Sequence, residues 1–303
     1  MSQPAANNDA APIEQDLYKK REKIYPREVH GIFAALRLLA MAALLGIFYG
    51  LPWINWDGHQ AVLFDLPARK FHIFSLTFWP QDFFYLSMLL IIAAISLFMF
   101  TTLAGRLWCG YACPQTVWTE IYMWIERKIE GTARQQKKRD QGPRNAGYWG
   151  IKSAKHGAWL LFSLWTGFTF VGYFTPVREL WGSVLTWNLG PWETFWIFFY
   201  GFATYGNAGF MREQVCIYMC PYARFQSVMF DHDTLIISYD EQRGDPRGSR
   251  KRGTPSSSVG LGDCIDCGLC VQVCPVGIDL RDGLQSQCVG CAACIDVCDD
   301  VMD

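Results

Sequence analysis

The stretch Cys264-Ile-Asp-Cys267-Gly-Leu-Cys270-Val-Gln-Val-Cys274-Pro275 decides the fold of the C-terminal part of this chain. A second run, Cys288-x2-Cys291-x2-Cys294-x3-Cys298, repeats the spacing, so eight of the twelve cysteines stand in these two runs. Three thiolates on one tight loop can hold three corners of a [4Fe–4S] cubane, and the fourth ligand must come from elsewhere. Zinc sites are built from CxxC pairs, which suit this spacing less well. The two runs therefore predict two [4Fe–4S] clusters, which move single electrons.

Together the runs resemble a bacterial ferredoxin with two clusters, a small α+β domain. In that fold the fourth cysteine of each run crosses to the other cluster. The resemblance implies that one cluster is held by Cys264, Cys267, Cys270 and Cys298. The other is then held by Cys288, Cys291, Cys294 and Cys274. Asp299 stands where a generic run has proline, which is a departure from the pattern.

The rest of the chain has the composition of a membrane protein. Charged residues make up only 18% and aromatic residues 16%, and a net charge of −1 predicts no nucleic-acid partner. Apolar residues gather in four runs, each close to the roughly 20 residues that cross a bilayer core. The runs are 32–55, 83–104, 157–175 and 192–210. We therefore expect a polytopic α-helical membrane protein with four transmembrane helices, the last two of which pack against other helices through Gly and Thr.

Lys and Arg residues set the expected orientation. Residues 127–155 carry nine of them against two acids, whereas the segments after the first and third runs carry only Arg69, Lys70 and Arg178. The N-terminus, the middle loop and the cysteine-rich region should therefore be cytoplasmic. In that reducing compartment the cysteines are expected to be metal ligands rather than disulfides.

The pattern divides the chain into segments. They are a cytoplasmic tail (1–31), a membrane domain (32–230) with a basic cytoplasmic loop (105–156), a connector (231–262) and the cluster domain (263–303). Within the connector, residues 234–239 are expected to form a short strand. Residues 114–130 are expected to form an amphipathic helix in the membrane interface, and a role for Glu120 in binding a quinol is left open.

Two further cysteine motifs form an internal repeat. Cys109-Gly-Tyr-Ala-Cys113-Pro114 follows the second apolar run, and Cys216-Ile-Tyr-Met-Cys220-Pro221 follows the fourth. Because each follows an out-and-back hairpin, a pseudo-two-fold axis along the membrane normal would bring the motifs face to face. Soft thiolates at this spacing select Cu(I), zinc or an iron–sulfur cluster. Packed apolar cysteines are the alternative. Arg106 and Arg212 would lower the thiol pKa values if they lie close.

These motifs and the ferredoxin runs together resemble the CcoG/FixG/RdxA family, accessory proteins of cbb3-type cytochrome c oxidase. The likeness rests on residues 108–118 and 211–226 and on both cysteine runs. It implies a cupric reductase in the bacterial cytoplasmic membrane that converts Cu(II), its substrate, to Cu(I) for oxidase assembly. Cys109, Cys113, Cys216 and Cys220 would then be the catalytic residues and hold copper or a third cluster. The family usually continues into a further transmembrane helix and a periplasmic immunoglobulin-like domain, which these 303 residues lack.

The resemblance leaves the partners open. The electron donor is expected to be a soluble reductant or a quinol. A copper chaperone or assembly factors of the cbb3 oxidase would be protein partners, membrane lipid is a further partner, and a homodimer is left open. A looser likeness to NapH-type electron-transfer proteins favours a quinol-linked conduit to a partner reductase. A third alternative is a copper-binding assembly scaffold with structural clusters.

Overall fold

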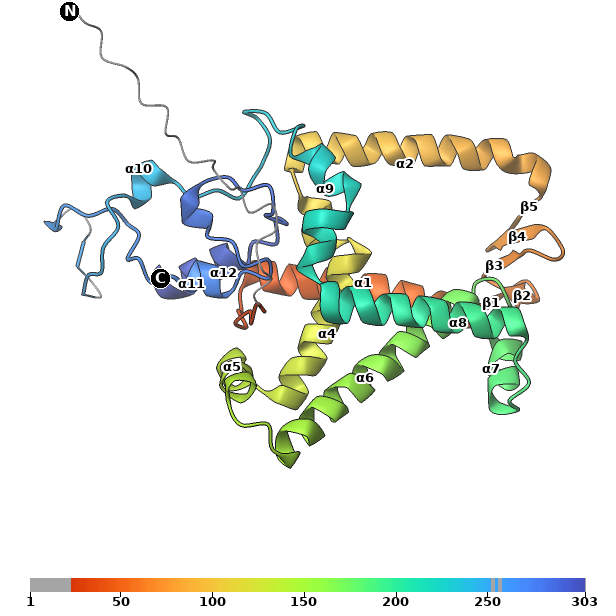
Figure 1. The fold of residues 1–303 in the computed structure, drawn as a ribbon. Coiled ribbons are helices and arrows are strands. Elements are labelled where there is room, and N and C mark those ends of the chain that lie inside the picture. Colours follow the sequence, from red (N-terminus) through yellow and green to blue (C-terminus); the bar gives the residue numbers. More distant parts are fainter. Residues whose placement is uncertain (1–22, 252–253, 256–257, 303) are drawn as a thin grey trace, which may run out of the picture.

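The computed structural model describes residues 23–251, 254–255 and 258–302. The chain is mostly helical (Figure 1), with short strands and α7 at one end and the cysteine-rich unit at the other. The α-helices are α1 (Ile32–Gly50), α2 (Phe83–Ala104), α3 (Leu107–Tyr111), α4 (Pro114–Glu130), α5 (Ala133–Gln141), α6 (Ala146–Val171), α7 (Val177–Leu185), α8 (Pro191–Thr204), α9 (Pro221–Gln226), α10 (Glu241–Gly244), α11 (Leu269–Gln272) and α12 (Ala293–Met302). The 3-10 segments are η1 (Leu51–Trp53), η2 (Pro80–Asp82) and η6 (Leu280–Asp282), and the π-helical segments are η3 (Tyr205–Met211) and η4 (Val215–Met219).

Two of the four expected membrane spans are present as such. Within the described residues, Ile32–Trp53 and Pro80–Ala104 are the helical segments long and apolar enough to cross a membrane. The other two expected spans are helical but do not meet that test, so two of the four expected segments are long and apolar enough to be spans. The reason for α8 is its length, since it has 14 residues before the chain becomes π-helical at Tyr205. In α6, lysines, glycines, threonines and tryptophans lower the hydropathy.

The helices α6 and α8 nevertheless pack closely, as their composition predicts. A Cβ on Gly167 would stand only 2.2 Å from the carbonyl oxygen of Ile197, so glycine lets the two backbones approach. Phe168, Val171 and Ile197 continue this contact in a core shared with α7. The first hairpin is different, because α1 contacts α3, α6 and α12 while α2 contacts α3 and α9. The expected symmetry of two packed hairpins is therefore incomplete.

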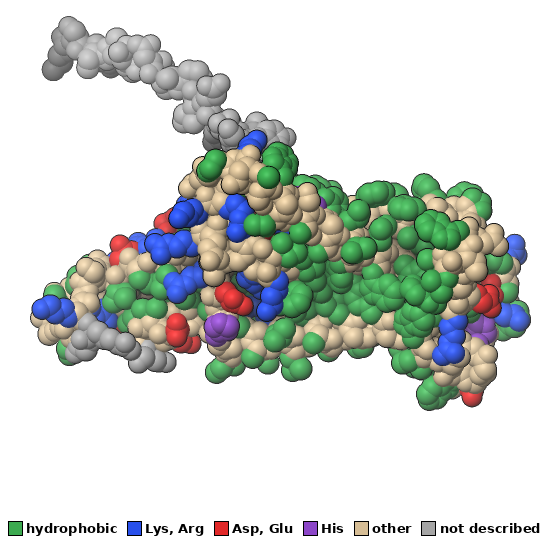
Figure 2. Space-filling model, turned by 90° about the horizontal axis from the view of Figure 1, so that it is seen from below, with side chains coloured by type: hydrophobic (Ala, Val, Ile, Leu, Met, Phe, Trp, Pro, Cys, Tyr) green, Lys and Arg blue, Asp and Glu red, His purple; other side chains and the backbone are tan. Residues whose placement is uncertain are grey.

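The surface of the molecule is strongly segregated. Figure 2 shows hydrophobic side chains over the helical part and Lys and Arg gathered toward the cysteine-rich end. Along α2 the side chains are exposed apart from a few half-buried ones, and Thr101 is the buried one. An apolar surface of this extent indicates that the protein associates with a membrane.

Strands occupy the segment between α1 and α2, where the sequence analysis expected only a sparse loop. They are β1 (Asn55–Trp56), β2 (His59–Gln60), β3 (Val62–Asp65), β4 (Lys70–Ile73) and β5 (Leu76–Phe78). β1 pairs with β2, and β3, β4 and β5 form an antiparallel sheet. Buried Gln60 joins this region to the second hairpin, since its Nε2 donates to the Gly172 carbonyl at 2.7 Å and its Oε1 accepts from Val177 N at 2.9 Å.

Two expectations about strands are wrong. Residues 234–239 are not paired in a sheet, because their polar groups instead satisfy free carbonyls at the end of α2: Leu235 N donates to Leu103 O at 3.0 Å, and Thr234 Oγ1 to Thr102 O at 2.8 Å. The cysteine-rich unit is also not α+β, since its described residues 258–302 hold short helices and loops without a strand.

The expected tail, 1–31, lies partly outside the described residues, which begin at Lys23. Its described part packs on the cysteine-rich unit. Arg27 N donates to the Gln272 carbonyl at 2.9 Å, and Val29 packs against a core that includes Val273 and Val297.

Candidate metal centres

Both CxxxCP motifs have the same local architecture. In each, the first cysteine lies in a short helix, α3 or η4, and the second is the N-cap of the next helix, α4 or α9. The prolines occupy the first helical turn, where a missing N–H leaves no intrahelical bond unmade. Proline therefore begins a new helix in each motif and turns the chain so that the two cysteines of each pair share one site.

The four cysteines of these motifs lie within electrostatic range of one another. Burial raises the pKa of the Cys109 thiol to about 12, and the thiols of Cys113, Cys216 and Cys220 add charge repulsion. Burial likewise raises the pKa of Cys216 to about 11, with Cys113 and Cys220 adding to it. Such repulsion requires closeness. We call Cys109, Cys113, Cys216 and Cys220 the membrane thiols.

Arg106 is the cation of this site. It is 6% exposed, donates to the Ala223 carbonyl, and opposes the burial that raises the thiol pKa values of Cys109 and Cys216. Arg212 occupies the matching place in the repeat but turns away, since it donates to Glu126 at 2.6 Å and lies over the ring of Trp159. The expectation that both arginines act on the thiols therefore holds for Arg106 alone.

Gln226 is a further polar side chain at the membrane thiols. It is fully buried, its Nε2 donates to Cys109 Sγ at 3.3 Å, and its Oε1 has no hydrogen-bond partner among the described residues. A buried amide oxygen left without a partner is uncommon and indicates a missing water, ion or ligand. Gln226 and the soft thiols together fit a bound metal or cluster. No spacing signal in the sequence marks Gln226, so the sequence analysis missed it.

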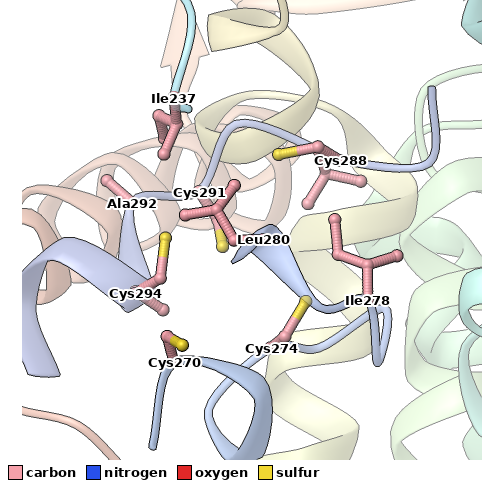
Figure 3. Close-up of a pocket in the computed structure, with 11 residues that line it drawn as sticks. Ile237, Cys270, Cys274, Ile278, Leu280, Cys288, Cys291, Ala292 and Cys294 are labelled. Atoms are coloured by element: carbon pink, nitrogen blue, oxygen red, sulfur yellow. The ribbon is translucent and has the colours of Figure 1, made fainter. Parts of the chain in front are cut away.

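The eight cysteines of the ferredoxin runs fall into two groups. Cys274, Cys288, Cys291 and Cys294 surround one apolar pocket, which Cys270 also lines (Figure 3). Burial raises the pKa of Cys294 to about 12, with repulsion from Cys291, Cys288 and Cys274. We call these four the proximal set.

Cys298 lies with the other run. Burial raises the pKa of its thiol, and Asp299, Cys267 and Cys264 add to the effect. Cys274 therefore lies in a pocket lined mainly by cysteines of the second run, and the Cys298 thiol is within electrostatic range of Cys264 and Cys267. We call Cys264, Cys267, Cys270 and Cys298 the distal set, and its role as a ligand set stays a prediction.

The donor chemistry of all three groups suits clusters better than a single zinc ion. Among the described residues, no three His, Cys, Asp or Glu side chains converge closely enough to hold one metal ion. A single zinc or copper ion would therefore require the thiols of a group to move closer together on binding. A cubane spreads its four thiolates farther apart, so the groups are compatible with [4Fe–4S] binding.

A buried ion network lies behind the membrane thiols. Glu126, 3% exposed, pairs with Arg212, with Lys155 at 3.3 Å and with Lys23 at 3.5 Å. Burial opposes its ionisation, yet these cations hold its pKa at about 2. Neighbouring Glu130, 1% exposed, pairs with Lys155 at 2.9 Å.

The helix predicted over 114–130 is confirmed as α4, but its acids are placed differently than expected. Glu126 and Glu130 turn inward against α6 rather than toward the membrane interface. Glu120 is 40% exposed and pairs with Arg127 at 3.1 Å, so it lines no enclosed site for a quinol. Periodicity along one helix could not show which polar face a second helix would cover.

Comparison with known proteins agrees with this geometry. The family model of a 4Fe-4S dicluster domain matches residues 211–303, and that of a 4Fe-4S binding domain matches residues 86–131. Nitrogen fixation protein FixG of Rhizobium meliloti is 42% identical over 97% of this chain and 57% of its own length. Proteins RdxB and RdxA of Cereibacter sphaeroides are 45% and 42% identical, over 95% and 96% of this chain and 61% and 62% of theirs. The chain belongs to the FixG/RdxA/RdxB family.

As a FixG/RdxA/RdxB protein with these domains, the chain is an iron–sulfur protein whose cofactors are [4Fe–4S] clusters. It spans about three fifths of the length of the curated relatives it matches. No solved structure matches it. The match over 86–131 includes Cys109 and Cys113 but no other cysteine, so a cluster there would need ligands from the second motif.

Proposed function

We propose that this chain is a membrane-bound iron–sulfur oxidoreductase that reduces Cu(II) to Cu(I) for assembly of a cbb3-type cytochrome c oxidase. The observation that carries the proposal is the gathering of four soft thiols, with Arg106 beside them. The same arginine also opposes the raised pKa of Cys288 in the proximal set. In this proposal the thiols that would hold Cu(I) adjoin the proximal set, which would hold a source of single electrons.

The residues of the site favour the reduced metal. Thiolates bind Cu(I) more strongly than Cu(II), which raises the driving force for reduction. Arg106 favours the thiolate form, and the Gln226 amide donates to one of the sulfurs. Bound [4Fe–4S] clusters would supply one electron for each Cu(II). Because only an electron moves, the step balances without the transfer of a proton or a change in any covalent bond.

We place the site at the cytoplasmic face of the bacterial inner membrane. In this proposal α6 and α8 join α1 and α2 as spans, because their close packing through Gly167 is that of membrane helices. The basic segment from α4 through α5 to the start of α6 and the cysteine-rich unit then lie on the cytoplasmic side. A copper chaperone or oxidase assembly factor would take the Cu(I).

A single-turnover experiment tests the activity. Anaerobically reduced protein, freed of reductant, is mixed with Cu(II) while cluster absorption and chelator-trapped Cu(I) are followed. We expect one Cu(I) for each cluster electron lost, and no Cu(I) from a Cys113→Ser/Cys220→Ser variant that retains its ferredoxin clusters. Clusters that stay reduced beside Cu(II) would overturn the proposal.

A second candidate is an electron conduit with a third cluster at the membrane thiols, as the family match over 86–131 favours. Iron analysis separates the two. Two clusters contain about eight iron atoms per chain and three contain about twelve. The higher count, with cluster reduction by quinol and no Cu(I) formation, would establish the conduit. Clusters that ignore Cu(II) although the thiols bind it would instead establish the copper scaffold.

A further inference from the structure

The cysteine-rich unit is hydrogen-bonded to α1, the first membrane helix, through a carboxylate. Asp296 of α12 is 4% exposed and accepts hydrogen bonds from Phe33 N at 3.0 Å and Ala34 N at 2.7 Å. The N-cap of α1 is Gly31, which offers no side chain of its own, so Asp296 caps this helix from 263 residues away along the chain.

A second fastening ties α1 to the proximal set. The Arg37 guanidinium donates a hydrogen bond to the carbonyl of Cys291. A proximal ligand is thus held by its own backbone to the membrane part.

The two backbones also meet at a pair of glycines. A Cβ on Gly110 would stand 2.8 Å from the carbonyl oxygen of Gly290 and 3.0 Å from that of Val289. Gly290 itself has φ +68 and lies on the backbone of Arg106. The loop between Cys288 and Cys291 therefore rests directly on α3, between the two cysteines of the first CxxxCP motif. We call this contact the glycine joint.

The distal set includes the most exposed cysteines. Cys267 and Cys298 are the two exposed cysteines of the twelve, and both belong to this set. In Figure 1 α10 lies farther from α1 than α12, which contacts α1. A quinol dissolved in the bilayer would meet the proximal side, whereas a water-soluble protein can reach the exposed edge.

We infer that the unit is docked for electron flow in one direction, from a soluble one-electron carrier protein at the Cys267–Cys298 edge to the membrane thiols across the glycine joint. Each step moves one electron: the carrier is oxidised, the acceptor at the thiols is reduced, and no bond or proton changes. Gly110, Gly290, Arg37 and Asp296 are positioning residues for this path. The inference rests on the proposed function only for the identity of the acceptor, Cu(II).

The joint is tested with Gly110→Leu and the milder Gly110→Ala. Gly150→Leu in α6 is the matched control, because nothing lies within 4 Å of a Cβ there. We expect faster amide exchange over residues 288–291 in the Gly110 variants, with unchanged cluster absorption. Reoxidation of the clusters by Cu(II) should slow by about tenfold or more in Gly110→Leu. Native exchange and native reoxidation in both Gly110 variants would overturn the joint. If Cu(II) did not reoxidise the clusters of the wild-type protein, the proposed function would be overturned. Amide exchange over residues 288–291 would still test the glycine joint.

The direction of electron flow is tested by comparing a soluble protein donor with a quinol donor. Reduced flavodoxin and decylubiquinol are each mixed anaerobically with oxidised protein in nanodiscs. We expect rapid cluster reduction by flavodoxin, a rate changed severalfold by Asp299→Lys beside Cys298, and no change with Glu179→Lys on α7 at the opposite end. Faster reduction by the quinol, or equal effects of the two charge reversals, would overturn a soluble carrier at the distal edge.

Discussion

Arg212 donates to the buried carboxylate of Glu126 at 2.6 Å, and this bond joins the second CxxxCP segment to α4. Arg106, its counterpart in the repeat, instead stands among thiols. Repeat symmetry therefore extends to the backbone of the two motifs but not to their charges. One arginine serves the redox site and the other serves the fold.

Removing the Glu126 charge should strongly destabilise the membrane part. Glu126→Gln leaves Arg212 and Lys155 buried with less compensation, which typically costs about 3–5 kcal/mol. The control is Glu120→Gln, because exposed Glu120 and half-buried Arg127 form a pair worth about 0–1 kcal/mol. Thermal unfolding in detergent measures both, and equal losses would contradict the assignment of Glu126 as a buried structural anion.

The same carboxylate predicts a pH dependence. Its pKa in the folded protein is about 2, below the ordinary 4.5. The unfolded chain therefore takes up this proton first as pH falls, so the stabilisation is complete above about pH 4.5 and is lost toward pH 2. The difference in Tm between the native protein and Glu126→Gln should narrow across that window. Cluster loss in acid affects both proteins alike, and a difference that stays constant would contradict the pKa.

Arg106 should set redox potential. Its positive charge stabilises the reduced, more negative state of whatever the membrane thiols and the proximal set hold. Arg106→Gln should therefore lower those potentials by tens of millivolts, since a one-electron couple moves about 59 mV per tenfold change in equilibrium constant. The control is the double variant Arg212→Gln/Glu126→Gln, which leaves no buried charge unpaired. Redox titrations followed by EPR compare the two, and an equal shift in the control would refute the distinction between the arginines.

Features encoded by spacing along the chain were predictable from the sequence. The x2-x2-x3 runs and the repeated CxxxCP motif carry their ligand geometry locally, so the groups that the structure assembles were all named in advance. The two most apolar helices were equally accessible, because length and hydropathy alone define them.

Contacts between distant segments were not predictable. Asp296 is two residues from Cys294 and gives no sign that it caps a helix near the N-terminus. Near the N-terminus, the sequence shows only that Gly31, at the start of α1, has no side chain that could cap the helix. The role of Gln226 likewise depends on its hydrogen bond to Cys109, which lies 117 positions away in the sequence. The expectation of an α+β cluster domain was wrong because it rested on analogy with a known fold, and residues 258–302 of this structure contain no strand.

Gln226 should tune the membrane thiols rather than support the fold. Gln226→Leu removes the N–H donor to Cys109 Sγ and also the unpartnered buried oxygen, so stability should be unchanged or higher. A lost hydrogen bond to a thiolate should weaken Cu(I) binding by about tenfold or more, since bonds to charged groups are worth about 1.5–3 kcal/mol. Competition with a Cu(I) chelator measures this. Exposed Gln141→Leu on α5 is the control, and unaltered affinity in Gln226→Leu would contradict the role.

Crossed ligation predicts which cluster each fourth cysteine serves. Cys298 stands in the second run but lies with Cys264 and Cys267, so Cys298→Ala should perturb the exposed, distal cluster. Cys274 stands in the first run but lines the proximal pocket, so Cys274→Ala should perturb the buried cluster. A water-soluble paramagnetic agent distinguishes the two by EPR, because it relaxes the exposed cluster faster. If each variant instead lost the cluster of its own run, the runs would ligate without crossing. The proximity of Cys274 to the second run would then need another explanation.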